Sequence, residues 1–313
     1  MRKLKLSSFL LGAVILTLFV FFFVGFPQKQ EVTWGVNFSQ KHAEGVGLDW
    51  KELYTALLED MEVRNFKIAV HWDQLEPAKD AFSFADLDWQ MQKAKEKEAT
   101  VTLVVGMKTP RWPECHLPSW FGDLSREEQE KELLEYVKAV VERYKDNSQL
   151  SYWQVENEPF FGFGNCPWRS KDVLIEEIDL VHSLDTEHPV VITDTGEFSL
   201  WDRAAKYGDI VGVTLYRKIY SDPLNMYISY PFTPMTYWRR AQIIKTIFNK
   251  ETIGIELQTE PWGPKRWTYI PLDEQAKTMT PEKFSTQEHI IRSISFGRRM
   301  PKSLLKTQKR FLR

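Results

Sequence analysis

The sequence has 313 residues, of which 43% are hydrophobic and 14% aromatic, enough for one large buried core. Its 41 basic and 43 acidic side chains give a net charge of −2, which excludes the strongly cationic composition of most nucleic-acid-binding domains. Two cysteines are too few for a disulfide framework or a zinc site of four thiolates. We expect an ordinary globular protein without a nucleic-acid partner.

The amino terminus differs from the rest of the chain. Basic residues within the first five positions precede an uninterrupted run of apolar or small residues at 9–26, followed by Pro27. A run of about 18 residues is short for a membrane span and long for the core of a cleavable signal. The lack of a small-x-small cleavage site favours an uncleaved anchor, with a cleaved signal peptide as the alternative. In either case residues 1–30 are a targeting segment, and the remainder is expected outside the cytoplasm.

Beyond this segment, short β-branched or aromatic runs alternate with longer stretches of helical periodicity, which is typical of consecutive βα units. The predicted strands are 33–38, 65–70, 100–106, 150–155, 190–194, 210–215 and 252–256. The predicted helices are 49–61, 86–97, 125–144, 170–185 and 236–248. Residues 125–128 have the Ser-x-x-Glu pattern of a capping box.

A regular βα order fits either a closed (β/α)8 barrel or an open, doubly wound sheet. The open sheet usually carries a glycine-rich phosphate loop after its first strand, and Gly35, Gly45 and Gly47 do not have that spacing. We therefore expect an α/β fold of TIM-barrel type over residues 31–297. In such barrels the chemistry lies at the carboxyl ends of the strands.

Two acids and an amide follow the fourth predicted strand, in the run Glu156-Asn157-Glu158-Pro159. At a barrel mouth an acid can protonate a glycosidic oxygen while an amide binds a sugar hydroxyl. We assign these roles to Glu158 and Asn157, and a solvated loop acid is the plainer alternative for Glu158.

Another carboxylate ends the seventh predicted strand. Glu256 closes that strand directly, whereas Glu260 lies four residues further on in an expected loop. Because a rigid element holds a reacting group better than a loop does, Glu256 is the expected nucleophile and Glu260 the alternative. A retaining reaction needs the two carboxyls roughly 5 to 5.5 Å apart.

Three segments in this order resemble glycoside hydrolase clan A. Along the chain they are the stretch from Lys67 through His71 and Trp72 to Glu76-Pro77, then Asn157-Glu158-Pro159, then Ile255-Glu256. The resemblance covers residues 33–265. It implies a TIM barrel and retaining hydrolysis of O-glycosidic, β-linked bonds in a poly- or oligosaccharide through a covalent intermediate. With six scattered histidines and no ligand cluster, neither a metal nor a cofactor is expected.

The resemblance also implies residues that support the reaction. Lys67 stands where the clan usually has an arginine near the nucleophile. Tyr216 ends the sixth strand, where the clan commonly places a tyrosine that touches the nucleophile. We interpret His71 as a ligand of a sugar hydroxyl, with a structural histidine as the alternative.

Aromatic rings just after predicted strands are candidate sugar platforms, because sugars present flat apolar faces. The candidates are Trp72, Trp112, Trp168 and Trp262. Asp194, Glu197 and Trp201, after the fifth strand, are expected to line another subsite. For each of these tryptophans ordinary packing is the alternative.

Cys115 and Cys166 follow the third and fourth strands, so their loops should be neighbours on the active face. Outside the cytoplasm the two thiols can pair and stiffen the sugar cleft. Two free thiols are the alternative.

The end of the chain departs from the clan pattern. No eighth strand can be recognised after Trp267, and residues 298–313 form a basic tail with seven Lys or Arg and no acid. A barrel with an irregular eighth strand and an incomplete barrel both remain open. The incomplete barrel makes a carbohydrate-binding pseudoenzyme the main alternative to a hydrolase, and a transglycosylase is a further one. We expect a monomer whose partners are a carbohydrate and, through residues 1–30, a membrane.

Overall fold

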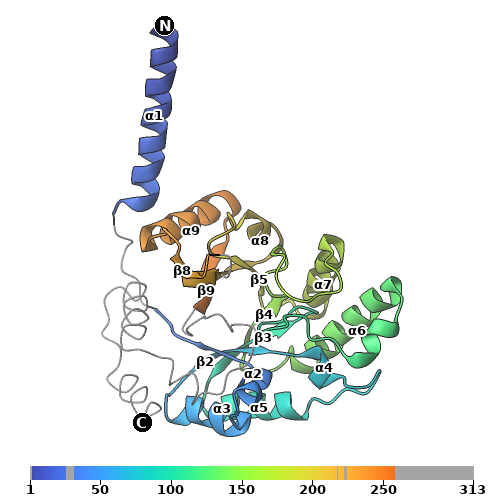
Figure 1. Ribbon diagram of the computed structural model, residues 1–313. Coiled ribbons are helices and arrows are strands. Elements are labelled where there is room, and N and C mark those ends of the chain that lie inside the picture. Colours follow the sequence, from blue (N-terminus) through green and yellow to red (C-terminus); the bar gives the residue numbers. More distant parts are fainter. Residues whose placement is uncertain (1, 26–31, 217, 222–223, 258–313) are drawn as a thin grey trace.

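The computed structural model describes residues 2–25, 32–216, 218–221 and 224–257. Seven parallel strands surrounded by helices form an incomplete (β/α)8 barrel, which confirms the predicted fold class (Figure 1). The sheet order is β1-β2-β3-β4-β5-β6-β9, the order of these strands along the chain. Each βα unit therefore lies beside the preceding one. Because the strands are parallel, their carboxyl ends, which carry the polar residues, all lie at the same edge of the sheet.

The seven predicted strands are all present, with ends that differ by at most a few residues. They are β1 (Val36–Phe38), β2 (Asn65–Ala69), β3 (Thr100–Val105), β4 (Leu150–Val155), β5 (Val190–Thr195), β6 (Ile210–Leu215) and β9 (Glu251–Leu257). A separate antiparallel hairpin, β7 (Lys218–Ser221) with β8 (Met226–Ser229), follows β6 and was not predicted. A register shift at Val213/Thr214, between β6 and β9, brings Thr214 opposite Glu256.

The five predicted helices are present too. They are α3 (Trp50–Glu59), α5 (Ala85–Glu96), α6 (Arg126–Tyr144), α7 (Lys171–Leu184) and α9 (Pro234–Phe248). The short elements α2 (Gln40–Gly45), α4 (Trp72–Leu75), η1 (Ser119–Asp123) and α8 (Asp202–Tyr207) were not predicted. The capping box at the start of α6 is formed, with the Ser125 amide donating to the Glu128 carboxylate at 2.8 Å.

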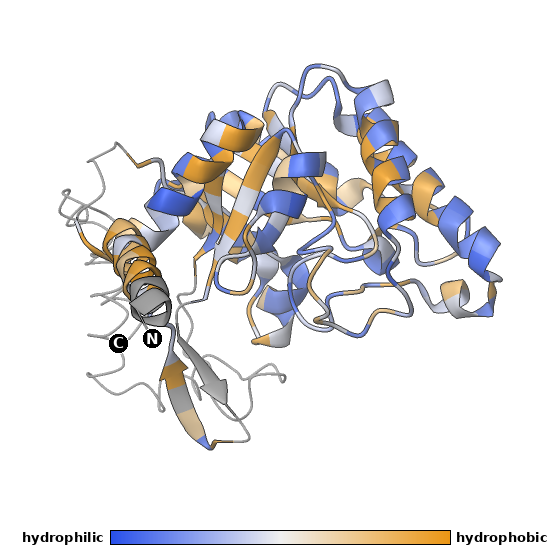
Figure 2. Cartoon of the chain, turned by 90° about the horizontal axis from the view of Figure 1, so that it is seen from above, coloured by the Kyte–Doolittle hydropathy of each residue, from blue (hydrophilic) through white to orange (hydrophobic). Residues whose placement is uncertain are grey.

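The core lies between the sheet and the helices. Val101, Leu103 and Val105 of β3 are fully buried, as are Tyr136 and Val140 on the inner face of α6. Burying a side chain of this size contributes about 1.5–3 kcal/mol. Figure 2 shows the same division, with hydrophobic residues concentrated on the strands and hydrophilic residues on the outer sides of the helices. This packing makes the strand ends a rigid support.

The amino-terminal helix α1 (Arg2–Phe23) projects from the domain (Figure 1). Its end packs on α9, where the Thr236 hydroxyl donates to the Phe22 carbonyl at 3.0 Å and the Arg239 guanidinium lies 4.6 Å from the Phe21 ring. Among the described residues, none of the helices combines the length and apolarity that crossing a membrane requires.

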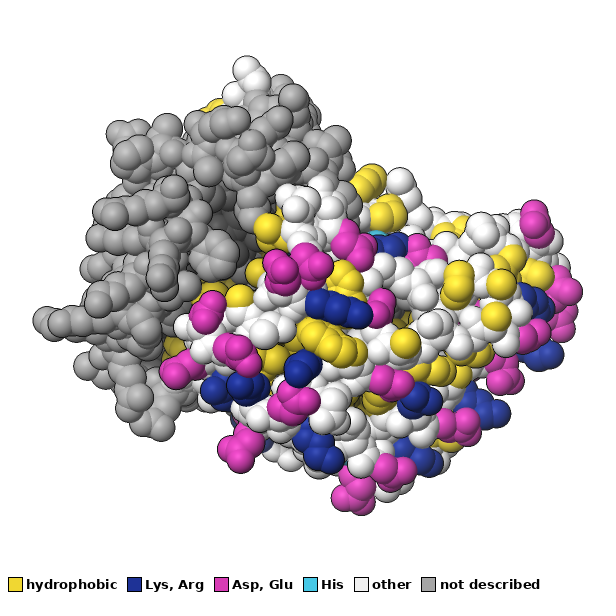
Figure 3. Space-filling view, turned by 90° about the horizontal axis from the view of Figure 1, so that it is seen from below, with side chains coloured by type: hydrophobic (Ala, Val, Ile, Leu, Met, Phe, Trp, Pro, Cys, Tyr) yellow, Lys and Arg dark blue, Asp and Glu magenta, His cyan; other side chains and the backbone are white. Residues whose placement is uncertain are grey.

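Several predictions concern the end of the chain. Outside the described residues lie Glu260, Trp262, the segment after Trp267 in which no eighth strand was recognised, and the basic tail at 298–313. Within the described part, β1 and β9 form the two edges of the sheet. On the face seen in Figure 3, acidic and basic side chains are interspersed, in keeping with the small net charge.

Candidate active site

The two expected catalytic carboxyls both lie at the carboxyl end of the sheet. Glu256 is the last residue but one of β9, and Glu158 lies three residues beyond β4. Thr214 of β6 connects them, because its hydroxyl donates to Glu158 Oε1 while its backbone pairs in register with Glu256. The charge of Glu256 also acts on Glu158, so the two groups share one electrostatic environment.

Both carboxylate oxygens of Glu256 accept strong hydrogen bonds. Lys67 Nζ donates to Oε1 at 2.6 Å, and Tyr216 Oη donates to Oε2 at 2.8 Å. Burial disfavours the charged form of Glu256, but the charge of Lys67 and these two hydrogen bonds outweigh it, so the pKa of Glu256 lies below its usual value. Lys67 and Tyr216 thus lie at the carboxyl for which the sequence proposed them. Glu256 is held as an ion, which is the form of a nucleophile.

Glu158 is shifted in the opposite direction. Burial and the charge of Glu256 raise the pKa of Glu158 to about 7, although the hydrogen bond from Thr214 opposes the shift. Its backbone amide donates to Thr193 Oγ1 at 2.7 Å, which fixes the start of the loop. A carboxyl that is protonated near neutrality and sits beside an ionised one has the property of a general acid.

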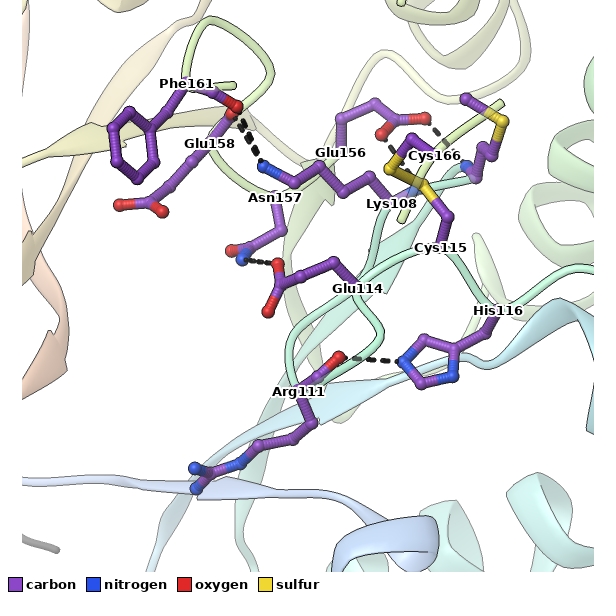
Figure 4. Close-up of a disulfide and its surroundings, with 11 residues drawn as sticks. Lys108, Arg111, Glu114, Cys115, His116, Glu156, Asn157, Glu158, Phe161 and Cys166 are labelled. Carbon is purple, nitrogen blue, oxygen red and sulfur yellow. Dashed lines mark hydrogen bonds between the residues drawn. A yellow bond between two sulfur atoms is a disulfide. The ribbon is translucent and has the colours of Figure 1, made fainter. Parts of the chain in front are cut away.

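A buried lysine, Lys108, holds the loop that carries Glu158. Lys108 Nζ donates to the carbonyls of Glu158 and Phe161 at 3.1 and 3.3 Å, and its own carbonyl accepts from the Asn157 amide at 2.7 Å (Figure 4). Glu156 and Glu158 both have positive φ, of 59° and 45°, a conformation that the backbone adopts only when held there. The sequence analysis missed Lys108, since a lysine after β3 is not distinguished by any pattern.

Asn157 binds a third carboxyl at the site. Its Nδ2 donates to Glu114 Oε2 at 3.0 Å, and its Oδ1 accepts from Gln154 Nε2 at 3.2 Å. The amide is therefore oriented on both sides. Glu114 was not predicted, because it lies nine residues beyond β3 in a loop whose path the sequence does not indicate.

The loops after β3 and β4 are joined covalently. Cys115 and Cys166 form a disulfide, as their predicted proximity allowed. Beside it, the Asn165 amide donates to the Pro113 carbonyl at 2.9 Å. The bridge therefore links the loop of Glu114 to the loop of Asn157 and Glu158 (Figure 4).

Two predicted substrate ligands belong to the interior instead. The Trp72 side chain is 0% exposed, stacks on Tyr136, and donates through Nε1 to Glu76 at 2.7 Å. The prediction that it binds sugar is wrong, because the chain turns into α4 and directs the ring into the core. His71 is buried with Nε2 bonded to Ser39 Oγ and Nδ1 to Thr109 Oγ1, which leaves neither ring nitrogen for a sugar hydroxyl.

The other aromatic candidates divide in the same way. Trp201 is 1% exposed and donates to the Thr195 carbonyl, so the subsite predicted around it is not formed. Trp168 is fixed by a hydrogen bond to Gln129 and by the Arg126 guanidinium, 3.6 Å from its ring. The two acids predicted beside Trp201 also accept hydrogen bonds from the protein. The Ser199 hydroxyl donates to Asp194, and the Tyr237 hydroxyl donates to Glu197. Trp112 is half-buried against Phe163, with ring centroids 5.9 Å apart, and stays a candidate platform.

In the described part of the chain, no three His, Cys, Asp or Glu residues gather in a metal-binding arrangement.

The sequence model of Glycosyl hydrolase family 10 matches residues 29–173, just under half of the chain. The search of curated proteins found no match to this chain. Among solved structures, xylanase 10B of Thermotoga maritima is 14% identical with a TM-score of 0.51, over 78% of this chain and 75% of that one. The β-galactosidase of Marinomonas ef1 is 13% identical with a TM-score of 0.50, over 80% of this chain and 52% of that one. The β-galactosidase of Halorubrum lacusprofundi is 18% identical with a TM-score of 0.44, and the match covers 58% of this chain and 40% of the enzyme's length. At these identities the likeness to the first two structures shows the barrel fold alone.

Proposed function

We propose that the chain is a glycoside hydrolase of clan A, which hydrolyses a β-linked O-glycosidic bond of a poly- or oligosaccharide with retention of configuration. The observation that carries the proposal is the opposite shift of two neighbouring carboxyls, with the pKa of Glu158 raised and that of Glu256 lowered. One group can therefore give a proton while the other attacks.

In the first step a Glu256 oxygen forms a bond to the anomeric carbon. The bond from that carbon to the leaving oxygen breaks, and the leaving oxygen keeps the electron pair of this bond. The same oxygen takes the proton of Glu158. Lys67 and Tyr216 hold Glu256 in place through one oxygen each, and attack by the carboxylate reduces the charge that they stabilise.

In the second step Glu158, now a carboxylate, removes a proton from water. The water oxygen bonds to the anomeric carbon, the ester bond breaks, and its electron pair returns to Glu256. Ester formation removes the charge of Glu256, which had raised the pKa of Glu158. The pKa of Glu158 therefore falls at the stage where it must act as a base.

The test uses Glu158→Ala and Glu256→Ala with an aryl β-glycoside and sodium azide. With Glu158→Ala, we expect the covalent intermediate to form and azide to restore turnover, giving a β-glycosyl azide. With Glu256→Ala, azide attacks directly and gives the α-product. Glu135→Ala, on the exposed side of α6, is the matched control and should behave as the unsubstituted protein. Full turnover by both site variants would refute the assignment.

The two alternatives follow from the same residues and give different products. A transglycosylase would pass the glycosyl group from Glu256 to a sugar acceptor, so added oligosaccharide would give longer chains in place of free sugar. A pseudoenzyme would bind β-glucans or related polymers without releasing reducing ends. The opposite pKa shifts of Glu158 and Glu256 favour the hydrolase over the pseudoenzyme.

We also propose that the protein acts outside the cytoplasm as a monomer and is attached to the membrane through residues 1–30. Two observations support this placement: the disulfide, which persists in oxidising compartments, and the exposed apolar side chains of α1, such as Phe9 and Leu11. Fractionation of cells should then recover the chain with membranes, and external protease should cut it in intact spheroplasts. Recovery in the cytosol would refute the placement.

A further inference from the structure

Glu114 brings a third carboxyl to the site, on the loop between β3 and α6. Its side chain is 6% exposed and reaches Asn157, the residue next to Glu158. In Figure 4 the carboxyls of Glu114 and Glu158 lie along the same side of the two bridged loops. The charges of both Glu158 and Glu256 act on Glu114, so it lies within electrostatic range of the pair that breaks the bond. Burial raises the pKa of Glu114 to about 8.

Two other buried acids, Glu156 and Glu76, have a protein donor on each carboxylate oxygen. Glu156 accepts from the amides of Met107 and Lys108 at 2.7 and 2.8 Å, one on each oxygen. Glu76 likewise accepts from Trp72 and from the Asp80 amide. Glu114 uses only Oε2, and among the described residues nothing donates to its Oε1. A carboxyl oxygen to which the protein donates no hydrogen bond can accept one from a ligand or from water.

The neighbouring loop is shaped around Glu114. Gly164 has φ of 101°, and a Cβ there would lie 2.6 Å from the Cβ of Glu114. Cys115 follows directly and is tied to Cys166 two residues beyond Gly164. The backbone on both sides thus fixes where the carboxyl points, which is what a binding group requires.

We propose that Glu114, together with Asn157, binds one hydroxyl of the sugar in the cleavage subsite and so selects substrates that carry this hydroxyl. The proposal rests on the function proposed above. Glu114 takes no part in bond making or breaking. It contacts the sugar through Oε1, while its hydrogen bond through Oε2 orients the Asn157 amide toward the same ring.

The test compares Glu114→Ala and Glu114→Gln with the unsubstituted protein on an aryl β-glycoside and on its monodeoxy analogues, one for each hydroxyl of the ring. For the parent glycoside we expect Glu114→Ala to lower kcat/KM about tenfold or more. For one deoxy analogue the unsubstituted protein and Glu114→Ala should be nearly equal, because the hydroxyl that Glu114 binds is missing. Glu114→Gln, which keeps a hydrogen-bonding group of the same size, should lie between.

A structural role predicts another pattern, in which every analogue loses activity by the same factor. That result would overturn the proposal, as would unchanged kinetics. Equal thermal unfolding midpoints for the two variants exclude misfolding as the cause, and Glu135→Ala is again the control. If the unsubstituted protein hydrolyses no glycoside, the proposed function fails while this inference is still tested. Calorimetric binding of a β-linked oligosaccharide should then weaken in Glu114→Ala, and unchanged binding would contradict it.

Discussion

At the scale of single residues, the contrast between Glu158 and Glu256 comes from their partners, because both are buried glutamates. Glu256 lies against a cation and a phenol, whereas Glu158 lies against a threonine hydroxyl and the negative charge of Glu256 itself. Catalysis needs Glu158 protonated and Glu256 ionised, so its pH dependence reports these environments.

The pH profile of kcat/KM should be bell-shaped. Activity falls above about pH 7, where Glu158 loses its proton, and it falls again below the lowered pKa of Glu256. The midpoint of the lower limb therefore lies at a pH below the usual glutamate pKa of about 4.3. Initial rates on an aryl β-glycoside between pH 3 and 9 measure both limbs. A flat profile through neutrality would contradict the role of Glu158.

Thr214→Val should shift only the upper limb. The Thr214 hydroxyl stabilises the ionised form of Glu158, so its removal raises the pKa of Glu158 further and moves the limb to higher pH. Thr246→Val, an exposed threonine of α9 that bonds its own helix, is the control. An upper limb that stays in place or moves to lower pH would show that the hydrogen bond does not act on the acid.

Lys67→Met should shift the lower limb. Without the ammonium 2.6 Å away, the pKa of Glu256 rises and the limb moves toward neutral pH. Loss of an electrostatic partner at a reacting group lowers kcat by about 100-fold or more. Lys67→Arg keeps the charge and should retain the lower limb near its original position. If both variants have the same profile, Lys67 acts through packing and not through charge.

The sequence was a good guide to residues on strands and a poor one just beyond them. Lys67 lies on β2 and Tyr216 directly follows β6, where alternation predicts which way a side chain points. Glu256 was found because it ends the predicted strand, although a bulge and not regular alternation turns it toward Thr214. Trp72 follows β2 by three residues, but it is the first residue of the helix α4, and its side chain is buried in the core. Glu114 depends on a loop path with positive φ at Arg111 and Glu114 and on a disulfide, none of which has a local pattern.

At the scale of elements, length decided what could be predicted. The five longer helices span at least two turns and show an apolar periodicity, and the seven strands are runs bounded by polar residues. The short helices α2, α4 and α8 have at most six residues each, too few for a periodic pattern. The hairpin of β7 and β8 begins two residues after Tyr216, and its connection lacks the Asn-Gly or Asp-Gly pair that marks a two-residue hairpin turn.

The disulfide connects two loops across 51 residues of sequence. In the chain-entropy model, a closed loop of this length contributes about 4 kcal/mol to the free energy of unfolding. Cys115→Ser combined with Cys166→Ser should therefore lower the urea midpoint. It should also raise KM, because Glu114 and Asn157 lie on the released loops. Unfolding and kinetics with and without reductant check both effects, and reductant should not alter the double variant. An unchanged KM would show that the bridge serves stability alone.

At the scale of the whole molecule, two buried acids beneath the mouth make stability depend on pH. Glu177 of α7 is 1% exposed and hydrogen-bonds to Glu156, whose burial raises its pKa to about 7. Burial and the charge of Glu156 raise the pKa of Glu177 well above its usual value. The folded protein thus binds more protons than the unfolded chain, so stability falls as pH rises from about 4.3 through the raised pKa values.

Glu177→Gln should reduce the loss of stability with rising pH, since an amide resembles the protonated acid and does not titrate. The free energy of unfolding, measured in urea at steps between pH 4 and 8, should decline less in the variant than in the unsubstituted protein. Glu176→Gln, its exposed neighbour on α7, should leave the slope unchanged. Parallel curves for all three proteins would mean that Glu177 keeps its usual pKa in the fold.

The register shift between β6 and β9 has a consequence for how this chain tolerates insertions and deletions. A Cβ on Gly212 would touch Ile255, which therefore lies on the face that Gly212 shares with Thr214. In a regular strand the next residue, Glu256, would point to the opposite face, away from Thr214. The one-residue bulge lets both neighbours reach the same side. Loss of a single codon in β9 would thus bury the attacking oxygen against a helix while leaving the strand's composition almost unaltered.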